Sequence, residues 1–185
     1  MIKDIKTISI GTVWNDGDGA SMKAEIHTEP DFSAELNLLS PIETDMHLIR
    51  LKEGVSAIFT DFSTSTQLSC AKCLEKFTLP IEVDSFERHF LGSVLPKDAD
   101  PLEVFLISLK DMTIDLTEAF RQEIILHFPL IPVCSERCQG LCPSCTVNLN
   151  HQEHQSTCHY QEELEEQAKQ QDHKPLAQLK DLFKQ

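Results

Sequence analysis

Long apolar runs, glycine-rich loops and catalytic motifs are all missing from this sequence. No window approaches the ~18 apolar residues of a membrane-spanning helix, and residues 1–6 lack the apolar stretch of a signal peptide. Its six glycines form no phosphate-binding loop, and neither a G-x-S-x-G nor an H-E-x-x-H motif occurs. These absences predict a cytoplasmic protein that enters no membrane, takes no small-molecule substrate and is not an enzyme.

Positive charge is scarce as well. The chain has 16 Lys and Arg residues against 30 Asp and Glu residues, which leaves a formal net charge of -14 at pH 7. Proteins gain most of their non-specific affinity for nucleic acids when basic side chains neutralise phosphates. The composition therefore disfavours direct contact with RNA and makes a basic protein the easier partner, although acidity is also common among cytosolic proteins.

The chain has the length and composition of one folded domain with an appendage. It contains 185 residues, of which 41% are hydrophobic and 25% charged, as in ordinary globular proteins. Segments of strand-like composition alternate with turn-forming residues, and this pattern predicts an antiparallel β-meander or barrel-like sheet. The expected strands cover residues 22–27, 46–51, 55–68, 77–90 and 102–109.

One helix should pack on this sheet. Asp115 and Glu118 have the spacing of a capping box, and apolar residues recur at helical spacing as far as Leu126, before Pro129 ends the pattern. The sequence thus predicts an α+β fold in three parts. These parts are a core domain at 1–133 with its helix at about 116–126, a cysteine-rich zinc-knuckle segment at 134–160 and an acidic helical tail at 161–185.

The seven cysteines are the strongest chemical signal. In a chain without an export signal they should be reduced thiols, which favours metal binding over a disulfide framework. A segment poor in apolar residues contains five of them, namely Cys134, Cys138, Cys142, Cys145 and Cys158. Such a segment cannot fold by apolar burial, but tetrahedral coordination of zinc by thiolates would supply the missing free energy. We expect four of these five residues to bind one structural Zn²⁺ ion, although iron accepts the same donors.

The sequence leaves the exact ligands open. Cys142 and Cys145 form a C-x2-C knuckle, while the other three cysteines compete for two positions, with His159 as a substitute. His151 and His154 are expected at the surface.

A second C-x2-C pair, Cys70 and Cys73, lies in a turn between two expected strands. Three interpretations compete for it: a second or composite metal site shared with the knuckle, a redox pair, or an ordinary hairpin turn. A redox pair would be expected at the start of a helix, where the helix dipole lowers the thiol pKa. The predicted β-meander therefore places the redox interpretation last.

Several short motifs follow one another over roughly residues 40–185. They are residues 41–50 (PIETDMHLIR), 68–77 (LSCAKCLEKF), 114–118 (IDLTE), 123–126 (EIIL), 129–134 (PLIPVC), 138–145 (CQGLCPSC), 148–150 (NLN) and 175–180 (PLAQLK). In this order they resemble the YceD family, and an ordered set is more specific than one C-x2-C pair. Two positions depart from the family pattern: Thr146 stands where glycine usually follows the knuckle, and 158–160 (CHY) stands where many members have C-x-C.

The resemblance implies a protein needed for the synthesis, processing or stability of 23S ribosomal RNA, with no catalytic activity attributed to the family. We accordingly expect a ribosome-biogenesis factor whose partner is a ribosomal protein or a large-subunit precursor particle. Two other classes of function stay open. One is a zinc-ribbon regulator that binds nucleic acid directly, and the other is a thiol redox protein that uses Cys70 and Cys73.

Overall fold

The computed structural model describes residues 7–30, 32, 36–92, 104–154 and 158–160. It divides the chain into two compact units. The first comprises Met1–Leu68 and Lys76–Pro132, and the second comprises Ser69–Glu75 and Val133–Gln185. The second unit thus includes a short turn from the middle of the sequence, which the predicted boundaries assign to the core domain. The tail helix expected at 161–185 lies outside the described residues.

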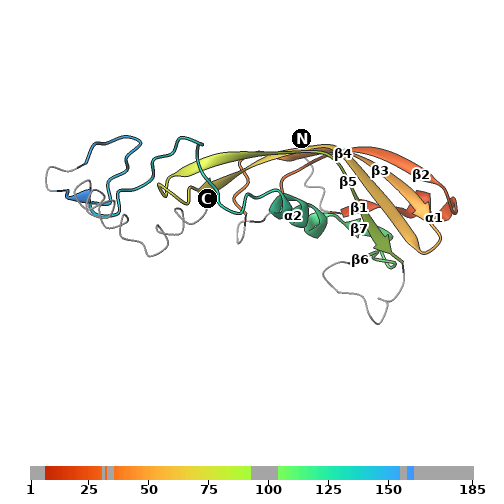
Figure 1. Cartoon of the computed structure of the whole chain (residues 1–185). Helices are drawn as coiled ribbons and strands as arrows, with labels where there is room; N and C mark the ends of the chain where they lie inside the picture. Colours follow the sequence, from red (N-terminus) through yellow and green to blue (C-terminus); the bar gives the residue numbers. More distant parts are fainter. Residues whose placement is uncertain (1–6, 31, 33–35, 93–103, 155–157, 161–185) are drawn as a thin grey trace, which may run out of the picture. The chain divides into compact units, whose positions relative to one another are not determined.

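A five-stranded sheet forms most of the first unit (Figure 1). Its strands, in spatial order, are β2 (Ser21–Thr28), β3 (Ile42–Leu51), β4 (Gly54–Ser69), β5 (Lys76–Leu91) and β6 (Phe105–Leu106). β2 pairs antiparallel with β3 and β3 antiparallel with β4, whereas β6 pairs parallel with the end of β5. The strands predicted at 22–27, 46–51, 55–68 and 77–90 are confirmed, each slightly longer than expected.

The sheet is not closed into a barrel, so the barrel-like form of the prediction is wrong. β2 and β6 form its two edges, and β6 pairs with β5 only through Phe105 and Leu106. A barrel requires the edge strands to pair with each other at a consistent tilt and register, which a two-residue strand cannot sustain. The strand expected at 102–109 is accordingly much shorter in the part of the chain that the structure describes, and residues 102 and 103 lie outside that part.

The sheet presents one apolar and one polar face. Along β3, Met46 and Leu48 are buried, whereas Glu43 and Asp45 are exposed. Successive side chains of a strand point to opposite faces, so this alternation assigns the buried residues to the core and the carboxylates to solvent.

Two helices and a second small sheet complete this unit. β1 (Thr7–Ser9) pairs antiparallel with β7 (Thr113–Asp115), and a short helix that the sequence did not predict, α1, covers Gly11–Asn15. The predicted helix is confirmed as α2, Thr117–Leu126. The expected capping box does not form, because the N-cap residue is Leu116, which makes no side-chain cap hydrogen bond. Asp115 Oδ1 accepts a hydrogen bond from the Thr117 amide at 2.8 Å, and the Glu118 carboxylate binds Arg121.

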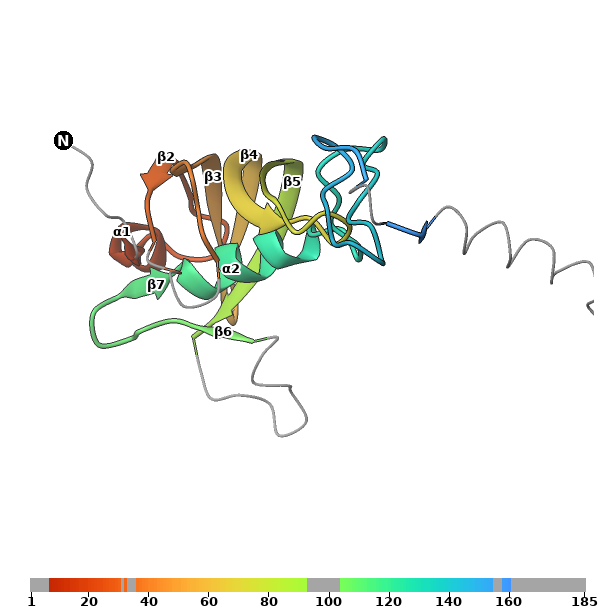
Figure 2. The same cartoon turned by 90° about the vertical axis from the view of Figure 1, so that its left-hand side faces the viewer.

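α2 lies against the apolar face of the sheet (Figure 2). Its Phe120 is buried and meets Phe59 of β4 edge-to-face, with 5.2 Å between ring centroids. The buried Glu123 accepts a hydrogen bond of 2.6 Å from Arg88 of β5, so an ion pair joins the helix to the sheet. None of the described helices has the length and apolar character needed to cross a membrane.

Candidate metal centre

The second unit has almost no apolar interior. Among its described residues, the buried ones are four cysteines and one glycine: Cys70, Cys73, Cys138, Gly140 and Cys142. None of these described residues belongs to the hydrophobic core cluster. Since burial of apolar side chains normally drives folding, another source of free energy has to hold this unit together.

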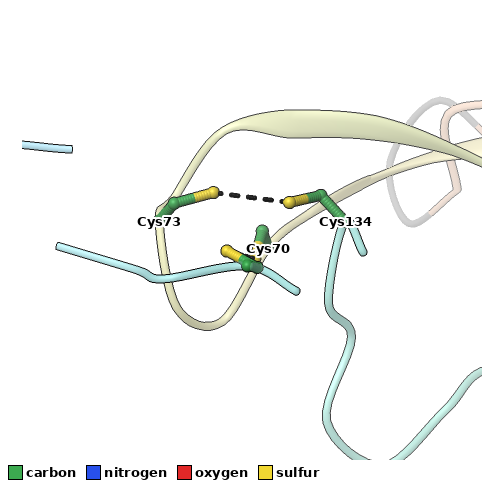
Figure 3. Close-up of side chains that lie close together, drawn as sticks. Cys70, Cys73 and Cys134 are labelled. Atoms are coloured by element: carbon green, nitrogen blue, oxygen red, sulfur yellow. Dashed lines mark hydrogen bonds between the residues drawn. The ribbon is translucent and has the colours of Figure 1, made fainter. Parts of the chain in front are cut away.

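Four cysteines meet at the turn that follows β4. Cys70 and Cys73 lie on the turn itself, and Cys134 faces them from the segment after residue 132 (Figure 3). Cys138 comes from the same segment as Cys134. The Sγ atoms of Cys70 and Cys138 are 3.7 Å apart, as are those of Cys73 and Cys134. All four sulfur atoms lie within 4.8 Å of one another.

These separations fit a tetrahedral metal shell. Zn–S bonds of about 2.3 Å at the tetrahedral angle place any two sulfurs about 3.8 Å apart. A disulfide would require about 2.05 Å, and all seven cysteines are free thiols. The cluster of Cys70, Cys73, Cys134 and Cys138, called the four-cysteine site below, could therefore hold one metal ion.

Hydrogen-bond donors point at two of the four sulfur atoms. The amide of Lys72 lies 3.4 Å from Cys70 Sγ, and the side-chain amide of Asn150 lies 3.4 Å from Cys138 Sγ. Burial opposes ionisation of Cys70, but backbone amides, first that of Cys73, outweigh it and lower the pKa of Cys70 to about 6. The hydrogen bond from Asn150 lowers the pKa of Cys138 in the same way. Both groups are therefore prepared to act as thiolates, the form that binds metals.

The other two thiols are held in their neutral form by crowding. The backbone amide of Glu75 favours the thiolate of Cys73, yet burial and the neighbouring thiols raise the pKa of Cys73 to about 12. The hydrogen bond with Cys138 and burial raise the pKa of Cys134. Four thiolates repel one another unless a cation lies between them, so a divalent ion is the natural way to ionise all four.

The structure distributes the predicted ligands over two groups. Cys134 and Cys138 meet Cys70 and Cys73, whereas the knuckle cysteines Cys142 and Cys145 lie elsewhere in the unit. These two knuckle cysteines group with His154 and Cys158. The composite site of Cys70 and Cys73 with the knuckle cysteines, which the sequence allowed, is therefore not formed. The turn cysteines group with Cys134 and Cys138 instead.

His154 is the residue that sequence reasoning assigned differently. It was expected at the surface, but it is half-buried, and its Nδ1 atom lies 3.4 Å from Cys158 Sγ. His159, the substitute considered from the sequence, is exposed and does not belong to the group. The spacing H-x3-C between His154 and Cys158 is the one sequence signal that could have identified it.

Comparison with known proteins gives distant relatives. A protein of Mycobacterium bovis and proteins of two Mycobacterium tuberculosis strains, all described as uncharacterized, are each 30% identical over 109 residues. The aligned region covers 58% of this chain and 51% of each relative, so the chain spans about half the length of the curated relatives it matches. No solved structure matches the chain.

A family model provides the assignment. The model described as "Large ribosomal RNA subunit accumulation protein YceD" matches residues 60–183. The matched region includes all seven cysteines, from Cys70 to Cys158, and therefore both groups of candidate ligands. We conclude that the chain belongs to the YceD family.

Proposed function

We propose that this chain is a non-enzymatic, cytoplasmic ribosome-biogenesis factor that supports accumulation of 23S ribosomal RNA, and that the four-cysteine site binds a structural zinc ion. The family match carries the ribosomal role, because the family is described by large ribosomal RNA subunit accumulation. The four-cysteine site supports the structural part of the proposal, because tetrahedral thiolate sites of this kind bind zinc in many small folded units.

The donor set favours a structural over a catalytic ion. A catalytic zinc keeps one coordination position for water or substrate, whereas four thiolates fill the tetrahedron. Cys70 is fully buried and Cys73 nearly so, which also keeps substrate away from the ion. The chemistry that zinc would supply here is therefore cross-linking: it would join the turn at 70–73 to the segment at 134–138.

The polar face of the large sheet supports a basic partner. Six exposed carboxylates gather on it around two adjoining hollows, which share Asp61 and Ser63 in their lining. This acidic face consists of Glu25, Glu43, Asp45, Asp61, Glu82 and Asp84, which come from β2, β3, β4 and β5.

Part of the acidic face opposes the stability of the sheet, although Glu43 lies 3.1 Å from His27 Nδ1 across the β2–β3 ladder. Glu25 and Asp45 occupy directly opposite positions of the β2–β3 ladder, where like charges are destabilising. Charged surfaces of one sign steer partners of the other sign and raise association rates. We therefore propose that a basic ribosomal protein, free or within a large-subunit precursor particle, binds this face.

Co-sedimentation tests the proposal. The full chain should migrate with large-subunit precursors in a sucrose gradient at low salt. A variant with Glu25→Gln, Asp45→Asn and Asp61→Asn should migrate near the top. Asn tolerates the left-handed backbone of Asp61, at φ 53°, as well as Asp does, so this change should not disturb the sheet.

A matched control removes the same charge elsewhere. Asp16→Asn, Asp18→Asn and Glu53→Gln neutralise three exposed carboxylates outside the acidic face and should leave co-sedimentation unchanged. Absence of the wild-type chain from every ribosomal fraction would contradict the proposal. Binding to protein-free ribosomal RNA fragments that weakens steeply with salt would instead favour the nucleic-acid-binding alternative.

A further inference from the structure

We propose that Cys142, Cys145, His154 and Cys158 form a second zinc site, with three thiolates and one imidazole, which is filled at the same time as the four-cysteine site. The ligand atoms of this second group lie within 4.8 Å of one another. The first group already contains four donors and completes a tetrahedron without them. The chain would thus carry two ions, and this inference does not depend on the ribosomal role.

The interatomic distances match those of a mixed sulfur and nitrogen shell. Cys142 Sγ and Cys158 Sγ are 3.7 Å apart, and His154 Nδ1 lies 3.4 Å from Cys158 Sγ and 3.9 Å from Cys145 Sγ. Zinc with bonds of about 2.3 Å to sulfur and about 2.05 Å to nitrogen gives tetrahedral edges of about 3.8 Å and 3.6 Å, respectively. The observed separations lie close to both values.

The turn at Cys142 has the same backbone hydrogen bonds as the turn at Cys70. In the first turn, the Cys70 amide donates to the Glu75 carbonyl at 2.8 Å and the Leu74 amide donates to the Cys70 carbonyl at 2.9 Å. In the second turn, the Cys142 amide donates to the Val147 carbonyl at 2.8 Å and the Thr146 amide donates to the Cys142 carbonyl at 2.9 Å. Each C-x2-C pair therefore forms a knuckle of the same type, in which its two thiols face the same side.

The two knuckles also share an unfavourable backbone conformation. The residue after the second cysteine has positive φ in each, 63° at Leu74 and 57° at Thr146. This conformation is unfavourable for a residue with a side chain, because its Cβ approaches the following carbonyl oxygen. The conformation explains why glycine would suit position 146. Its presence in both turns indicates that a common requirement, binding of a metal by the knuckle, holds the backbone there.

The partners of the second knuckle come from the following segment. His154 and Cys158 are four residues apart, and the His154 ring lies against the Tyr160 ring, with 5.9 Å between centroids. The Cys145 amide lies 3.5 Å from Cys142 Sγ. Three thiolates and one imidazole in a tetrahedral arrangement are a common donor set of structural zinc sites.

Native mass spectrometry of the full chain, purified without added metal, tests the inference. The wild-type chain should carry two zinc ions, and both His154→Ala and Cys145→Ser should carry one. His154→Cys should again carry two, because a fourth thiolate replaces the imidazole. His151→Ala is the matched control: this exposed histidine lies outside the group and contacts Glu75, so its removal should leave two ions.

X-ray absorption at the zinc edge of the wild-type chain gives a second readout. It uses no variant, so misfolding of a variant cannot affect the result. It should show seven sulfurs and one imidazole nitrogen shared between two zinc ions. A single zinc per wild-type chain, two zinc ions in His154→Ala, or a spectrum with sulfur donors alone would each overturn the inference. The zinc count is measured without ribosomes, so its failure is distinguishable from failure of the proposed function.

Discussion

Removal of zinc should unfold the second unit and leave the first unit folded. The buried residues in the described part of the second unit are four cysteines and one glycine, so apolar burial contributes little to its stability. A structural zinc site contributes about 10–16 kcal/mol to the folding of a small unit of this kind. Without metal, the free energy of folding of this unit should therefore become unfavourable.

Hydrogen exchange on the chelated full chain measures this effect amide by amide. The reporters are amides that donate backbone hydrogen bonds inside the second unit, namely those of Leu141, Cys142, Thr146 and Leu149. Loss of more than about 4 kcal/mol of local stability corresponds to a drop in protection of at least about a thousandfold. Amides of β3 and β4 should change by less than about tenfold, because they lie in the unit that contains the hydrophobic core.

The result that would refute this reasoning is equally specific. If elemental analysis confirms complete removal of metal and the reporter amides keep their protection, an interaction other than metal coordination holds the second unit together. Simultaneous loss of protection in both units would instead show that the first unit depends on the metal. That result would contradict the expectation that its own hydrophobic core stabilises it.

Three further predictions concern the first unit, and each is measured by urea unfolding followed through the single tryptophan. Phe120→Ala should lower the free energy of unfolding by about 3–5 kcal/mol because this ring is buried, and a loss below about 1 kcal/mol would contradict the packing described. Gly54→Ala should lower the free energy of unfolding by at least about 2 kcal/mol, because its Cβ would overlap the Phe90 carbonyl oxygen. The control Gly11→Ala, whose Cβ would have no neighbour nearer than 3.9 Å, should be nearly neutral. Equal effects of the two changes would argue against the close approach of Gly54 to Phe90. The hydrogen bonds from Arg121 lower the pKa of Glu118, so this carboxylate stabilises the fold above its unfolded pKa and the stabilisation is lost as the pH falls through the lowered folded pKa. Glu118→Gln should therefore cost roughly 0.3–0.5 kcal/mol at pH 7 and nothing once the pH lies well below the lowered folded pKa, whereas a difference independent of pH would exclude the charge as its cause.

Local patterns predicted most of the first unit. β3 and β4 have strand-like composition and are bounded by turn residues, and α2 begins beside the predicted cap Asp115. These patterns could not show whether the sheet closes into a barrel. That outcome depends on how few residues of β6 reach the end of β5, which is a long-range property.

All seven candidate thiols were named from the sequence, but their grouping was not. The spacing of cysteines shows that thiols are available, whereas the grouping depends on which segment folds against the turn at 70–73. Gly140 shows the constraint: a Cβ there would lie 3.1 Å from the Lys72 carbonyl oxygen, and its φ is +78°. This close approach of two distant segments brings Cys138 near Cys70, and no local pattern encodes it. His154 was missed because only its H-x3-C spacing to Cys158 distinguishes it from His151 and His159, and that spacing was not used.

The most direct test of the central claim is the ratio of large-subunit to small-subunit ribosomal RNA after depletion of this protein from its own cells. Depletion should lower the ratio, and re-expression of the wild-type chain should restore it. Ala71→Ser, an exposed change within the same turn, should also restore it, whereas Cys73→Ser, which removes a thiolate of the four-cysteine site, should not. An unchanged ratio after depletion would contradict the ribosomal role, and full rescue by Cys73→Ser would contradict the part assigned to the metal.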